Sequence, residues 1–147
     1  EETDQVELEK AILNDKDFVV YGFQPVRKEL RDSTKTSRID ILELYDHLTS
    51  GRLLRNMDAI LHFAKDYYTN YRRIGGTHSW HEVEIDFLIV ACATVHNLDL
   101  VCSRDQETFI NPKVQKMYVQ VNLLKGFRSP TFFSYEDLLR RFRKRLK

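Results

Sequence analysis

The chain has 147 residues, a length that fits one domain, and 42% hydrophobic residues are enough to build a core. Lys and Arg number 23 against 22 acidic residues, so the net charge of +1 gives no indication of a polyanionic partner. No apolar run reaches the length of a membrane span, and no signal peptide opens the chain, which excludes membrane insertion and predicts a soluble, cytoplasmic protein.

The N-terminal part predicts helices separated by one short strand. Apolar spacing over 5–13 favours a helix, and the aromatic and β-branched run 18–21 favours a buried strand. Pro25 suits the first turn of the next helix, which carries Glu29. A further amphipathic helix is expected over 39–48.

The central part predicts two core helices and a strand. The first helix begins near Asn56 and ends before Gly75, and Ser79 with Glu82 matches a capping box that starts the second. Residues 98–103 read as the strand that follows. The two cysteines lie in this part, and neither has a zinc-ligand or redox spacing, so we expect reduced, buried thiols.

The C-terminal part predicts a strand around 117–121 and a last helix from Ser134 onward. Strands that alternate with helices indicate an α/β protein. We therefore expect a single domain over 1–147, built as a three-layer α/β/α sandwich around a central, mainly parallel sheet.

Three acidic residues are candidates for one site. Asp105 follows the strand 98–103, Asp86 lies early in the helix before it, and Glu29 lies on the helix after the first strand. Ligand sites gather at the carboxyl ends of parallel strands, and neighbouring carboxylates repel unless a cation compensates them. The pattern predicts a Mg²⁺ or Mn²⁺ site, where metal-held water attacks a phosphodiester.

The same residues carry a family resemblance. Asp86 with Ile89, Ala91 and Ala93, then Leu100-Val101 and Ser103-Arg104-Asp105, resembles the second half of a PIN-domain nuclease. The specific block runs from Asp86 to Asp105, while the rest of the chain is compatible with the family pattern.

The resemblance implies a metal-dependent endoribonuclease that acts on RNA, either as the toxin of a toxin–antitoxin pair or as a processing enzyme, and often as a homodimer. Glu29, Asp86 and Asp105 would be the metal-liganding acids, and Ser103 would supply the hydroxyl that supports them. The cofactor would be a Mg or Mn divalent cation, and an antitoxin protein would be a partner.

The chain departs from the family at its start. The first strand of the family normally ends in an Asp, and nothing here matches it, because Asp4 follows no strand. Either the opening strand is missing from this chain or a ligand has been lost. The alternative to an enzyme is therefore a non-catalytic PIN-like module that binds RNA or protein. A receiver-like α/β domain fits less well, because its phosphoacceptor Asp and its Lys are not found in order.

Each of these candidate residues also has a purely structural explanation. Asp86 would also suit the positive end of a helix dipole, and Asp105 a turn after its strand. Glu29 lies among Arg27, Lys28 and Arg31, as on a solvated helix face. Six cations in the last eight residues would either complement the end of a helix or bind an RNA backbone.

Overall fold

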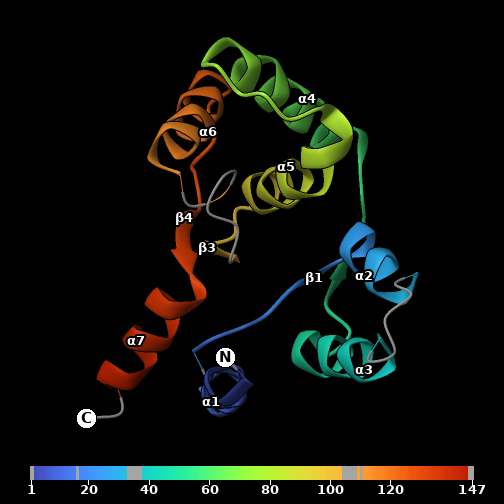
Figure 1. Ribbon diagram of the computed structural model, residues 1–147, viewed down its shortest axis with the longest axis vertical. Coiled ribbons are helices and arrows are strands. Elements are labelled where there is room, and N and C mark those ends of the chain that lie inside the picture. The colour runs from blue at the N-terminus through green and yellow to red at the C-terminus, as the bar shows by residue number, and fades with distance from the viewer. Residues whose placement is uncertain (1, 16, 33–37, 104–108, 110, 146–147) are drawn as a thin grey trace. The chain divides into compact units, whose positions relative to one another are not determined.

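The computed structural model describes residues 2–15, 17–32, 38–103, 109 and 111–145. These residues form seven helices and four short strands, whose course is drawn in Figure 1. Their order is α1 (Glu2–Asn14), β1 (Gly22–Phe23), α2 (Gln24–Arg31), α3 (Arg38–Thr49), β2 (Leu53–Leu54), α4 (Asp58–Arg73), α5 (Trp80–Val95), β3 (Leu100–Ser103), α6 (Pro112–Leu124), β4 (Thr131–Ser134) and α7 (Tyr135–Arg145).

The chain divides into two compact units. Unit 1 combines residues 1–56 with residues 138–147, and unit 2 is the continuous segment 57–137. Each unit has its own pair of parallel strands, β1 with β2 in unit 1 and β3 with β4 in unit 2. The expectation of one domain over 1–147 stays a prediction.

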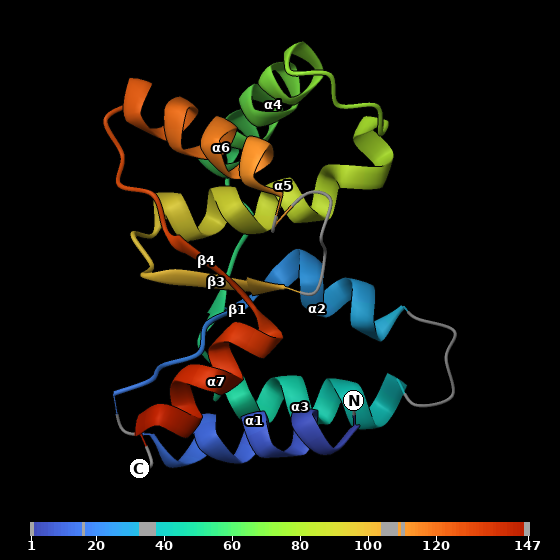
Figure 2. The same ribbon diagram turned by 60° about the vertical axis from the view of Figure 1, so that its left-hand side comes forward.

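The expected α/β/α sandwich around a central parallel sheet is wrong. The described residues hold two separate sheets, each of only two strands, and the remaining regular structure is helical (Figure 2). Strands of two to four residues offer too little surface to cover several helices. In unit 2 the helices instead bury their apolar faces on one another, with α4 packed against α5 and α6.

The strand expected over 18–21 is also wrong. Extended pairing begins only at Gly22, which is aligned with Leu53. The Phe18 ring packs edge-on against Phe142, with 5.1 Å between centroids. Val19 and Tyr21 of the same run are exposed, so only part of this aromatic and β-branched segment packs, and none of it forms a strand.

The strand expected over 117–121 is part of α6. The Asn111 side chain caps this helix, because its Oδ1 accepts hydrogen bonds from Lys113 N at 2.9 Å and Val114 N at 3.4 Å. Pro112 follows in the first helical turn. The buried positions of the helix recur at helical spacing: Val114, Met117, Tyr118, Val121 and Asn122.

The helices expected over 5–13, 39–48 and from Asn56 are confirmed, and so is the capping box at the start of α5. The Glu82 carboxylate accepts a hydrogen bond from Ser79 N at 3.0 Å. This bond, together with one to His78, lowers the pKa of Glu82. His78 thus takes part in ordering the helix start.

The core of unit 2 is aromatic. Tyr67, Phe87 and Tyr118 are fully buried and meet edge to face, with centroids 4.9 Å apart for Tyr67 and Tyr118 and 5.7 Å for Phe87 and Tyr118. Tyr71 is also buried.

Within the described part of the chain, no helix combines the length and apolar character that a membrane span requires.

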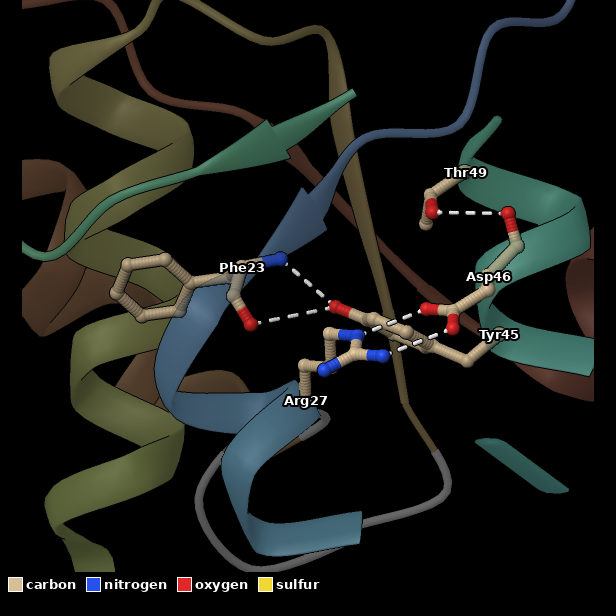
Figure 3. A network of polar contacts seen from close by, with 5 residues as sticks. All are labelled: Phe23, Arg27, Tyr45, Asp46 and Thr49. Atoms are coloured by element: carbon tan, nitrogen blue, oxygen red, sulfur yellow. Dashed lines mark hydrogen bonds and ion pairs between the residues drawn. The ribbon is translucent and has the colours of Figure 1, made fainter. Parts of the chain in front are cut away.

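Unit 1 joins α2 to α3 through polar contacts (Figure 3). The Arg27 guanidinium donates two hydrogen bonds to the Asp46 carboxylate, both at 2.9 Å. The Tyr45 hydroxyl accepts from Phe23 N at 2.7 Å and donates to Phe23 O at 3.3 Å. These contacts fix the start of α2 beside α3.

Candidate functional site

Two of the predicted site residues, Asp86 and Ser103, lie on the α5–β3–α6–β4 segment of unit 2. Strands β3 and β4 are parallel and joined by the crossover helix α6, and their register aligns Ser103 with Ser134. Both serines close their strands, so two hydroxyl side chains lie at the carboxyl edge of this sheet. Ligands favour this edge in parallel sheets.

Helix α5 brings Asp86 toward the same edge. The chain reverses after Val95, where Leu98 N donates to Ala93 O at 2.8 Å, and β3 then runs back along α5. The N-terminal half of α5, which carries Asp86, therefore lies at the end of the unit where β3 finishes (Figure 2). Asp86 is half-buried there.

The turn between α5 and β3 is held by one side chain. Arg128 donates to the Asn97 side chain at 2.8 Å, to the Asn97 carbonyl at 2.9 Å and to Asp99 at 3.1 Å. Asn97 has a φ of 55°, in the left-handed region that Asn tolerates. These bonds tie the segment after α6 to the turn between α5 and β3.

Asp137 is an acid near this edge that the sequence did not indicate as functional. Its backbone N–H donates to Ser134 Oγ at 3.1 Å, so it lies in the first turn of α7, directly after β4. Burial raises the pKa of the Cys102 thiol, and the charge of Asp137 raises it further. The available signal was the spacing of Ser134 and Asp137, which marks a helix start and by itself predicts no ligand.

The predicted acids fall in different parts of the molecule. Asp86 and Ser103 belong to unit 2, and Asp105 lies outside the described residues. Glu29 is exposed on α2 in unit 1. The structure therefore brings the helix of Asp86 to the strand of Ser103, and the parts played by Asp105 and Glu29 stay predictions.

The donor chemistry at this edge fits a hard cation, because carboxylate and hydroxyl oxygens are what Mg²⁺ and Mn²⁺ prefer. Among the residues that the structure describes, however, no three His, Cys, Asp or Glu side chains group closely enough to hold a metal ion. The metal site therefore stays a prediction.

The two cysteines are not part of such a set. Both are free, and Cys92 is buried while Cys102 is half-buried. Burial raises the pKa of each thiol to about 12, so both stay protonated near neutral pH. The expected burial is confirmed for Cys92 and only in part for Cys102. Protonated thiols are poor metal ligands.

Comparison with known protein families, with curated proteins and with solved structures gives no match for this chain.

Proposed function

We propose that the chain is a Mg²⁺- or Mn²⁺-dependent endoribonuclease whose acidic site lies at the carboxyl edge of the β3–β4 pair. The supporting observation is the reversal between α5 and β3. It carries the N-terminal half of α5, with Asp86, back to the edge where Ser103 ends its strand. The sequence resemblance to PIN-domain nucleases rests on these same two elements.

The role proposed for each residue follows from the oxygen ligand that its side chain offers. Asp86 and Asp105 hold the cation, and Asp137 is a further carboxylate at the same edge. The Ser103 hydroxyl supports a neighbouring carboxylate by hydrogen bonding. When bound, a divalent cation activates water and neutralises charge on the scissile phosphate. The half-buried position of Asp86 keeps part of its solvation shell away, which strengthens its attraction to a cation.

The test is cleavage of a panel of single-stranded and hairpin RNAs in Mn²⁺ by the unmodified chain and by Asp86→Asn and Asp105→Asn. We expect each variant to lose at least about tenfold in cleavage rate, the lower end of what loss of a metal-supporting group costs. Glu84→Gln is the matched control, because it removes the same charge from α5 two residues away. Asp137→Asn is compared in the same way with Glu136→Gln.

The outcomes separate the enzyme from the alternative. Cleavage that EDTA abolishes, and that falls in Asp86→Asn and Asp105→Asn but not in Glu84→Gln, supports the proposal. RNA binding without cleavage by the unmodified chain identifies a non-catalytic binding module. Equal cleavage by the chain and by both Asp variants rejects the proposed site.

A further inference from the structure

The cations near the end of α7 are engaged by acids from the start of the chain. The Arg143 guanidinium donates two hydrogen bonds to the Glu7 carboxylate, both at 2.7 Å, although the residues are 136 positions apart. Arg145 Nη1 lies 2.6 Å from Asp15 Oδ2, and Arg145 Nη2 lies 3.5 Å from Asp17 Oδ2. All five residues belong to unit 1.

Apolar packing holds this contact in place. The Phe142 side chain is buried and meets the Phe18 ring edge-on, which fixes α7 against the segment that follows α1. The side chains of Arg143 and Glu7 stay in contact with water, since they are 51% and 41% exposed, whereas the side chain of Asp15 is only 12% exposed. An exposed pair such as Arg143 with Glu7 is weak in water, so a competing anion can displace Glu7.

The geometry resembles the binding of a phosphate. A guanidinium presents two parallel N–H groups that suit a carboxylate and a phosphate equally. Glu7 therefore occupies on Arg143 the position that a phosphodiester oxygen pair would take.

We propose that α1 and the segment directly after it form an autoinhibitory element, in which Glu7 of α1 and Asp15 and Asp17 of that segment occupy the guanidinium groups of α7 that otherwise bind the RNA backbone. This inference rests on the proposed function, because it assumes that RNA is the ligand. Displacing the acids makes the N–H groups that they occupy on Arg143 and Arg145 available to two phosphates. Binding of RNA and the contact between α1 and α7 are then mutually exclusive.

The test measures binding of a fluorescein-labelled single-stranded RNA by fluorescence polarisation in EDTA, where cleavage cannot interfere. We expect Glu7→Gln to bind about two- to fivefold more tightly than the unmodified chain, the range set by the strength of an exposed pair. The dependence of affinity on salt should also steepen by about 0.7 for each additional phosphate that the protein neutralises. Glu9→Gln is the matched control, because it removes the same charge from the same helix.

A second variant isolates the contact. In an Arg143→Gln background the tighter binding caused by Glu7→Gln should disappear, because the released guanidinium is no longer present. Circular dichroism of each variant checks that the fold is kept. Equal affinities for Glu7→Gln and Glu9→Gln overturn the inference while leaving the nuclease proposal intact. No RNA binding by any variant in EDTA also overturns the inference, while cleavage in Mn²⁺ decides the nuclease proposal separately.

Discussion

Asn122 lies at the centre of a buried polar network in unit 2, where a lost partner is costly. The Tyr67 hydroxyl donates to Asn122 Oδ1 at 2.5 Å, while Asn122 Nδ2 donates to Thr94 Oγ1 at 3.2 Å and to Ser129 Oγ at 2.9 Å. Tyr67 and Asn122 are fully buried. Burial also raises the pKa of Tyr67, so its hydroxyl stays a donor at any ordinary pH.

We expect Tyr67→Phe to lower the free energy of unfolding by about 1–3 kcal/mol, because Asn122 Oδ1 is left buried without its donor. Urea unfolding followed by circular dichroism measures this loss. Tyr21→Phe is the control: Tyr21 is 44% exposed, and its loss should stay within about 0.5 kcal/mol. Equal losses for the two variants would contradict a structural role for the network.

At the site, features that depend on neighbouring residues could be predicted from the sequence, whereas a feature that depends on distant residues could not. The capping box at Ser79 and Glu82 was predictable because its bonds are local. The approach of α5 to the end of β3 was predictable because only a short turn separates the two elements. Asp137 was not, because its position near Cys102 depends on the pairing of β3 with β4, and these strands are distant in sequence.

At the scale of elements, α6 shows how a strand-like pattern can belong to a helix. Met117, Val119 and Val121 alternate with polar or amphipathic residues, as strand residues do, yet Val119 is 45% exposed. The deciding signal was the start at Asn111-Pro112, a capping residue followed by a first-turn proline. Helix-start chemistry therefore outweighed a five-residue alternation.

The contact between α2 and α3 gives a prediction about pH. Hydrogen bonding from Arg27, aided by its charge, lowers the pKa of Asp46 below its ordinary value of 3.8. A carboxyl whose pKa is lower in the folded state stabilises the fold above its ordinary pKa and loses this effect as the pH falls through the folded-state value. The stabilisation is thus present at neutral pH and disappears in strong acid.

We therefore expect Asp46→Asn to lower the melting temperature at pH 7, with a smaller difference from the unmodified chain at pH 3. Thermal unfolding followed by circular dichroism at both values measures this. Glu43→Gln serves as control, since Glu43 is an exposed acid on the same helix. A difference of the same size at pH 3 and pH 7 would show that the ion pair with Arg27 is not its source.

For the whole molecule, helices were predicted better than sheets. Amphipathic spacing located α1, α3 and α4, because the residues that form the buried face of a helix all lie within the helix itself. The sheets depend on which distant strands pair, and alternating strands and helices do not show that four strands split into two separate pairs. The expected PIN-like fold therefore predicted a larger sheet than the described residues form.

The composition of the two units bears on how the chain folds during synthesis. Residues 57–137 form a continuous unit, so all of its contacts can form as soon as that segment leaves the ribosome. Unit 1 needs residues 138–147 as well, and its first helix is made long before them. Until residues 138–147 have been synthesised, Glu7 has no arginine from α7 to pair with, and unit 1 cannot complete its contacts.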